Sequence, residues 1–120
     1  MTLERRIARA FLGAPDAEPE PTIAEGTAIA QPIRLPECLA VLRESGGGAV
    51  MLSEKEIGDA TLELARGGAY VEPTSAQAAA AFGRLLRAGS INPAETTVVV
   101  LTGSGLKSTP RIAELLGVAL

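Results

Sequence analysis

The sequence has 120 residues with a net charge of −3, 47% hydrophobic residues, three aromatic residues, one cysteine and no histidine. This composition excludes a histidine-based catalytic triad, a histidine metal site and a thiolate cluster, and it argues against nucleic-acid binding, which favours basic faces and stacking rings. With no apolar run near membrane-spanning length and no secretory signal at its start, the chain is expected to be a cytoplasmic protein with one modest domain, no metal and no membrane contact.

The first 21 residues are predicted to form an N-terminal arm. Apolar side chains spaced along one face indicate a short helix over residues 3–12. Residues 13–21 contain three prolines and three acidic residues, a composition typical of an extended linker. We therefore expect one α/β domain over residues 22–120.

The domain is expected to begin with a loop and a helix. Pro36 suits the first turn of a helix that runs to about Ser45 and carries Cys38 as a small helical residue. The glycine triplet at residues 46–48 follows this helix and precedes a strand, which is the reverse of the order in phosphate-binding loops. It is interpreted as a connection.

Helices and strands alternate through the rest of the chain. Strands are predicted at residues 49–52, 69–72 and 97–102. The helices between and after them should open at a Ser53/Glu56 capping box, a similar Thr74/Gln77 pair, and Thr109 before Pro110. Helical connections of this length force parallel pairing, so we expect a three-layer αβα unit with a short parallel sheet.

The most informative stretch is an apolar run, residues 98–101, that leads into the turn Thr102-Gly103-Ser104. Thr102 falls at the carboxyl end of a predicted parallel strand, where open α/β sheets bind ligands. The other interpretation of this turn is a tight connection that uses glycine for its backbone freedom. Glu72 ends the neighbouring strand and is either a second residue of the same cleft or a solvated acid.

Four blocks of the sequence carry a resemblance to a known family. In their order and spacing, they are similar to the carboxyl-terminal part of threonine synthases, within the tryptophan synthase β-like (fold type II) pyridoxal-phosphate enzymes. The blocks are residues 22–26, residues 43–47 leading to 53–57, residues 70–76 and residues 98–107. The resemblance implies pyridoxal phosphate as cofactor, with Thr102 on the pyridine nitrogen, Gly103 and Ser104 in the pocket wall, and Glu72 nearby.

The resemblance also implies which reaction the family catalyses and which parts of its active site this sequence lacks. The family's threonine synthases convert O-phosphohomoserine to threonine, and close relatives are serine/threonine dehydratases. The Schiff-base lysine and the phosphate loop belong to earlier segments of the family, and neither Lys55 nor Lys107 matches that lysine. The chain is thus expected to start in mid-enzyme, to carry the pyridine-ring side of the site without a catalytic residue, and to be inactive alone.

Two alternatives remain open, and both concern partners. The chain could be a non-catalytic interaction or oligomerisation module, or one half of a split dehydratase-like enzyme. A sheet of about three strands leaves an open edge and an exposed apolar face. We therefore expect a homo-oligomer, a complex with a separately encoded N-terminal half, or an arm folded across that face through Leu3, Ile7 and Phe11.

Overall fold

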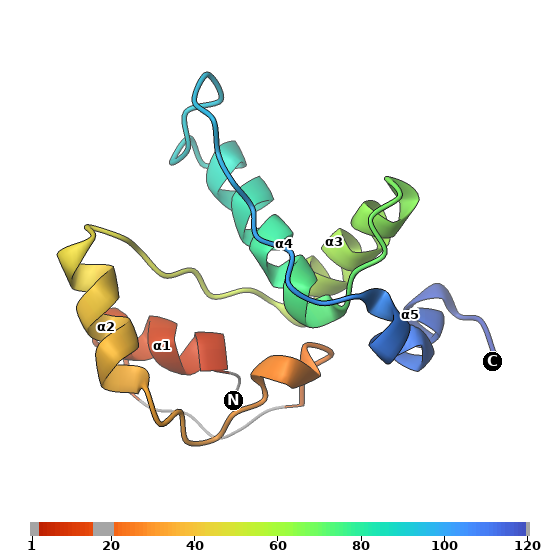
Figure 1. Cartoon of the computed structure of the whole chain (residues 1–120), viewed down its shortest axis with the longest axis horizontal. Coiled ribbons are helices and arrows are strands. Elements are labelled where there is room, and N and C mark those ends of the chain that lie inside the picture. The colour runs from red at the N-terminus through yellow and green to blue at the C-terminus, as the bar shows by residue number, and fades with distance from the viewer. Residues whose placement is uncertain (1–2, 16–20, 120) are drawn as a thin grey trace. The chain divides into compact units, whose positions relative to one another are not determined.

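The computed structural model describes residues 3–15 and 21–119. The chain forms two compact units, the first ending at residue 51 and the second beginning at residue 52. The first unit contains helix α1 (Leu3–Phe11), the short 3-10 helix η1 (Glu25–Thr27) and helix α2 (Leu35–Glu44). The second contains α3 (Glu54–Arg66), α4 (Pro73–Arg87), the 3-10 helix η2 (Gly105–Ser108) and α5 (Thr109–Leu116), as Figure 1 shows. Most of the predicted linker, residues 16–20, lies outside the described residues.

The first unit pairs α1 with α2. Both helices lie where the apolar spacing predicts them, and Pro36 is in the first turn of α2 as expected. Ala8 of α1 is buried, whereas α2 has no buried residue. Cys38 is a half-buried free thiol.

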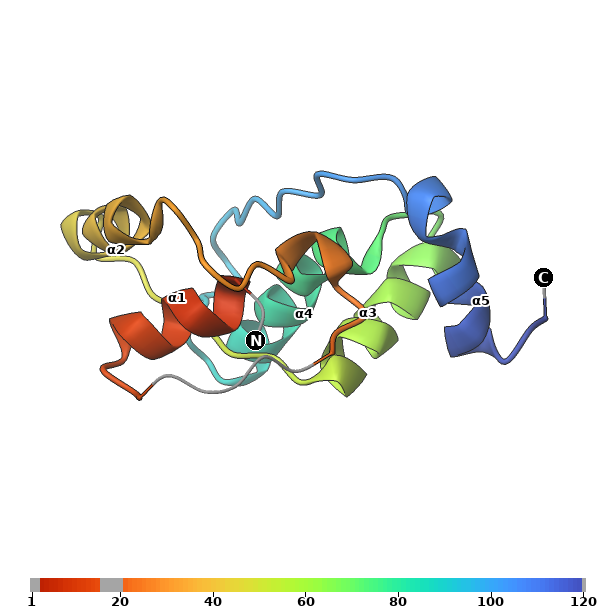
Figure 2. The same cartoon turned by 90° about the horizontal axis from the view of Figure 1, so that it is seen from below.

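The core of the second unit lies between α3 and α4, which run side by side, with α5 packed against α3 (Figure 2). The predicted capping box opens α3: the Ser53 hydroxyl accepts from the Glu56 amide at 3.2 Å, and the Ser53 amide donates to the Glu56 carboxylate at 2.8 Å. Ile57 and Thr61 are buried, and the Thr61 hydroxyl donates to the Ile57 carbonyl at 2.8 Å. On α4 the buried residues are mostly small, which allows the two helices to approach closely.

Two predicted helix starts are wrong by one or two residues. α4 begins at Pro73 with Glu72 as its N-cap, so Thr74 is inside the first turn and does not cap the helix. α5 begins at Thr109 with Ser108 as its N-cap. In both helices a proline occupies the first turn, where its missing N–H costs nothing.

The predicted parallel sheet is not formed within residues 3–15 and 21–119. The β-pairing found there is one isolated antiparallel bridge between Val71 and Ser104. It is held by the Glu72 amide, which donates to the Gly103 carbonyl at 3.1 Å, and by the Gly105 amide, which donates to the Tyr70 carbonyl at 2.9 Å. The helices are present, but a ladder needs a neighbouring backbone along its whole length, and the pairing in the described residues is confined to this one bridge.

The segment of residues 96–101 is extended and open. It returns from the end of α4 toward the start of that helix (Figure 1). Within the described chain its residues make no hydrogen bond, and the side chains of Val98 and Val100 are 80% and 66% exposed. The described part of the protein also has no helix of the length and apolar character needed to span a membrane.

Candidate functional site

The side chain of Ser75 attaches the turn from Thr102 to Ser104 to the first turn of α4. The hydroxyl oxygen of Ser75 accepts hydrogen bonds from the amide of Gly103 at 2.7 Å and from the amide of Thr102 at 3.1 Å. The same oxygen lies 3.1 Å from the Thr102 hydroxyl. Because Ser75 is only 3% exposed, water does not compete for these bonds, and the turn has one defined position on the helix.

Glu72 forms the second attachment of this turn. Besides the bond from its amide to Gly103, its carboxylate packs directly over the Gly103 backbone, so that a Cβ at residue 103 would overlap it. Lys107 reaches across from η2 and places its Nζ 3.2 Å from a Glu72 carboxylate oxygen. The Glu72 side chain is only 15% exposed. It is therefore a packed, ion-paired residue of the turn, and the interpretation as a solvated acid is wrong.

Ser104 and the residues after it close the turn. The Ser104 hydroxyl accepts from the Leu106 amide at 3.3 Å and caps η2. Gly105 is buried against the ring of Tyr70, whose hydroxyl lies 3.1 Å from the Thr109 hydroxyl. The hydroxyl of Ser104 thus caps the next helix, whereas that of Thr102 lies on an exposed residue and is hydrogen-bonded to Ser75.

The structure brings together residues that are far apart in the sequence. Glu72 and Gly103 are in contact, and Thr102 lies beside them, joined to Ser75. Sequence reasoning missed Ser75, although it belongs to the block of residues 70–76. The available signal was a serine in the first turn of an otherwise alanine-rich helix, beside the residue already singled out at position 72.

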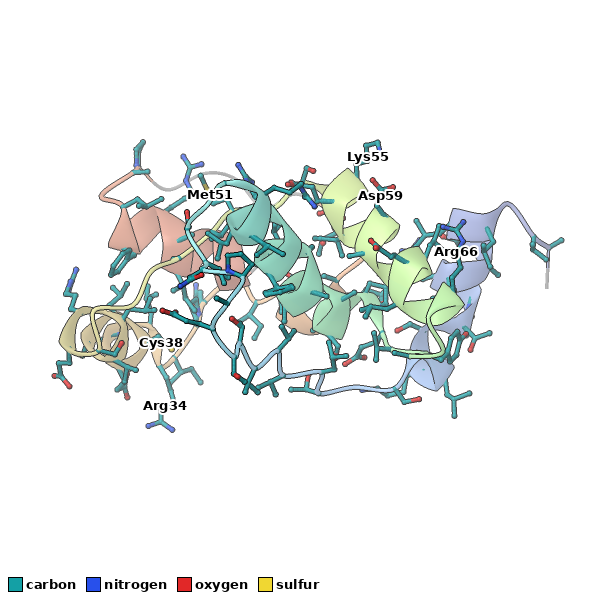
Figure 3. The ribbon with its side chains drawn as sticks, turned by 90° about the horizontal axis from the view of Figure 1, so that it is seen from above. Arg34, Cys38, Met51, Lys55, Asp59 and Arg66 are labelled. Atoms are coloured by element: carbon teal, nitrogen blue, oxygen red, sulfur yellow. The ribbon has the colours of Figure 1, made fainter. Side chains whose placement is uncertain are left out.

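Each of the two lysines is paired with a carboxylate. Lys55 pairs with Asp59 one turn along α3, and its side chain is 82% exposed. Figure 3 shows both side chains extending from the same side of that helix. Lys107 is 69% exposed and pairs with Glu72, as expected for a residue that pins a loop. Both amines are therefore exposed and ion-paired, and neither has the buried setting of a Schiff-base lysine.

Comparison with known proteins identifies the family. Residues 4–103 match the family model described as pyridoxal-phosphate dependent enzyme, which covers most of the chain. The chain belongs to this family. Its members use pyridoxal phosphate as cofactor and have the fold type II architecture.

Curated relatives agree with this assignment. The chain is 40% identical over 94 residues to the threonine synthase of Methanocaldococcus jannaschii, a match that covers 78% of this chain and 23% of the relative. It is 36% identical over 102 residues to the threonine synthase of Methanosarcina acetivorans (84% and 25%), and 38% identical over 97 residues to that of Bacillus sp. strain ULM1 (80% and 27%). The chain therefore spans about a quarter of the length of these relatives.

One part of the described chain fits this cofactor. A pyridine nitrogen needs one hydrogen-bonding group that is fixed in place and open on one side. Thr102 meets that requirement, because its backbone is held by Ser75 while the residue itself is exposed. The fit concerns the ring only, since both lysines are exposed and paired with carboxylates.

Proposed function

We propose that this chain supplies the pyridine-ring side of the cofactor site of a threonine synthase-like lyase, whose reaction converts O-phosphohomoserine to threonine. The observation that carries the proposal is the hydroxyl of Thr102, an exposed residue on a turn that Ser75 and Glu72 attach to α4. The family match and the identity to three threonine synthases support the reaction class.

Each residue of the turn has a distinct part in this proposal. Pyridoxal phosphate, when bound, supplies an electron sink for the amino-acid substrate. Thr102 would form a hydrogen bond to its ring nitrogen, while Gly103 and Ser104 would line the ring's edge. Glu72 would act indirectly, because its carboxylate packs over Gly103 and is paired with Lys107.

The site is incomplete within these residues. A covalent anchor for the cofactor needs a lysine whose amine reaches the pyridoxal carbon, and both Lys55 and Lys107 are exposed and ion-paired. The anchoring lysine and the phosphate loop would come from residues outside this sequence. We infer that the 120 residues alone do not catalyse the reaction.

The missing part would also complete the sheet. Residues 96–101 are extended, expose Val98 and Val100, and leave their backbone groups without a hydrogen bond in the described chain. Such a segment is a template for strand pairing. We propose that it and residues 49–52 are strands of a parallel αβα sheet whose other strands come from a second copy of the chain or from a separate polypeptide with the rest of the enzyme.

The same exposed segment supports a second candidate function. A chain with an unpaired apolar strand and no anchored cofactor would work as an interaction or oligomerisation module. The two functions differ in what they require of Thr102. The module does not use its hydroxyl, whereas the cofactor site depends on it.

A chimeric enzyme tests the proposal. The matching quarter of the Methanocaldococcus jannaschii threonine synthase is replaced by the corresponding residues of this chain, and threonine formation from O-phosphohomoserine is measured. We expect activity that Thr102→Ser keeps and Thr102→Val lowers by about tenfold, the cost of about one hydrogen bond. Thr96→Val is the matched control, because Thr96 is exposed and makes no hydrogen bond in the described chain.

The outcomes separate the candidates. A folded chimera in which Thr102→Val and Thr96→Val are equally active would contradict the ring-side role and favour the module. A chimera that deaminates serine or threonine without using the phosphorylated substrate would identify the dehydratase-like alternative.

A further inference from the structure

The hydrogen bonds around Ser75 fix more than the position of the turn. A serine hydroxyl has one donor hydrogen and two acceptor lone pairs. At Ser75 both acceptor positions are taken, by the amides of Thr102 and Gly103. The hydrogen that remains can be donated to the Thr102 hydroxyl oxygen 3.1 Å away, which is the other hydrogen-bond partner of this hydroxyl among the described residues. In this pair Ser75 is therefore the donor and Thr102 the acceptor.

From this we infer that Ser75 is a positioning residue that sets the direction of the Thr102 hydroxyl. Once its oxygen has accepted the hydrogen from Ser75, the hydrogen of Thr102 has to point away, toward the open side of the turn. Thr102 then presents a hydrogen-bond donor to a ligand. The inference rests on the proposed function, and it adds that the ligand atom at this place must be an acceptor, which for a pyridine ring means an unprotonated nitrogen.

The charged groups beside the turn do not by themselves favour either protonation state of the ring nitrogen. A lone carboxylate there would favour a protonated, cationic ring nitrogen. The carboxylate that packs against the turn is Glu72, and Lys107 lies 3.2 Å from it. As a pair they carry no net charge. The direction of the Thr102 hydroxyl then decides which protonation state of the ring is bound.

The first experiment uses pyridoxine 5′-phosphate, which carries the ring nitrogen of the cofactor but no aldehyde to react with lysine. Its affinity for the 120-residue chain is measured by NMR titration at pH values on either side of the ring nitrogen's protonation. We expect the chain to prefer the unprotonated ring. Ser75→Ala frees the Thr102 hydroxyl to rotate and should reduce this preference by about three- to tenfold, roughly the value of one hydrogen bond.

Three further variants identify the cause. Ser75→Thr keeps a hydroxyl at this position and should restore the preference. Thr102→Val should weaken binding at every pH and abolish the preference, and Thr96→Val should change neither. If Ser75→Ala keeps the preference of the unaltered chain for the unprotonated ring while Thr102→Val binds the probe more weakly, the role of Ser75 would be overturned. The ring site at Thr102 would still stand. Absence of any response at Thr102 and Gly103 to millimolar probe would overturn the ring site itself, and this inference with it.

A second measurement needs neither variant nor ligand. The hydroxyl protons of the unaltered chain are observed by NMR at low temperature. The Ser75 hydroxyl proton should exchange slowly with water, because it is buried and bonded to Thr102, whereas the Thr102 hydroxyl proton should exchange fast. The reverse order would mean that Thr102 donates to Ser75, and the inference would be wrong even if the Ser75 variants fail to fold.

Discussion

The carboxylate of Glu72 lies so close to the backbone of Gly103 that no side chain fits between them. Gly103→Ala would insert a Cβ into the space of this carboxylate, which is held there by Lys107. We expect the substitution to lower the free energy of unfolding by about 1–3 kcal/mol, the usual cost of overpacking. Urea denaturation followed by circular dichroism measures the change.

Two controls accompany this measurement. Gly48→Ala adds the same methyl group where no atom lies within 4 Å, and it should leave stability within about 0.5 kcal/mol. In the double variant Glu72→Ala with Gly103→Ala, the penalty of the second substitution should largely disappear. Equal costs of Gly103→Ala with and without Glu72 would show that the contact is not its cause.

Loss of Lys107 should have a small effect on stability and a larger one on the turn. The ion pair joins a well-exposed amine to a mostly covered carboxylate, so Lys107→Met should cost about 1 kcal/mol or less. The amides of Gly103 and Gly105 should then exchange faster with deuterium, because the pinned loop opens more often. Lys55→Met removes an exposed pair within α3 and serves as control. Unchanged exchange in the Lys107 variant would contradict a loop-pinning role.

The capping box of α3 makes stability depend on pH. Hydrogen bonds from the amide and the hydroxyl of Ser53 hold the pKa of Glu56 below its ordinary value of 4.5, with a smaller contribution from Arg84. Because the pKa of Glu56 is lower in the folded protein, its ionised carboxylate stabilises the fold at pH values above the ordinary pKa of 4.5. This stabilisation disappears as the pH falls through the lowered pKa. Glu56→Ala should therefore cost about 0.5 kcal/mol near pH 7 and progressively less as the pH falls below 4.5.

The control for this pH dependence is Glu56→Gln, which keeps an acceptor for Ser53 but does not titrate. Thermal unfolding of the three proteins at several pH values gives the comparison. If the stability difference between the unaltered chain and Glu56→Ala is the same at every pH, the effect comes from packing and not from the charge of the carboxylate.

The open segment of residues 96–101 should mediate association. Its amides are expected to exchange with deuterium at nearly unprotected rates in the monomer and to become protected at concentrations where light scattering reports an oligomer. Val98→Lys places a charge on the most exposed apolar residue of this segment and should shift the chain toward the monomer. Leu106→Lys, at an equally exposed apolar residue outside the segment, is the control. Protected amides in a strictly monomeric sample would contradict strand pairing between chains.

The chain alone should not attach pyridoxal phosphate at a specific lysine. After incubation at micromolar concentration and reduction with borohydride, mass spectrometry should find no stoichiometric adduct on Lys55 or Lys107, because both amines are exposed and paired with carboxylates. Pyridoxal phosphate bound stoichiometrically to one of them, or threonine formed by the chain alone, would overturn the proposal of an incomplete site.

The sequence by itself determined the helices and the family. Apolar spacing, prolines in first turns and the Ser53/Glu56 capping box act between residues a few positions apart, so they predict α1 to α5 to within a few residues. Four blocks of sequence, among them the one around Thr102, indicated pyridoxal-phosphate enzymes for a similar reason, since each block is continuous in the sequence.

Only the tertiary structure decided how the turn is built. Ser75 and Gly103 are 28 positions apart, and nothing local to Ser75 reveals that its hydroxyl ends at the Gly103 amide. The packing of Glu72 over Gly103 also depends on where the chain returns, as does the antiparallel bridge between Val71 and Ser104. The described residues do not form the predicted sheet, because an apolar strand pattern records a preference for burial, whereas a ladder forms only where another backbone lies alongside.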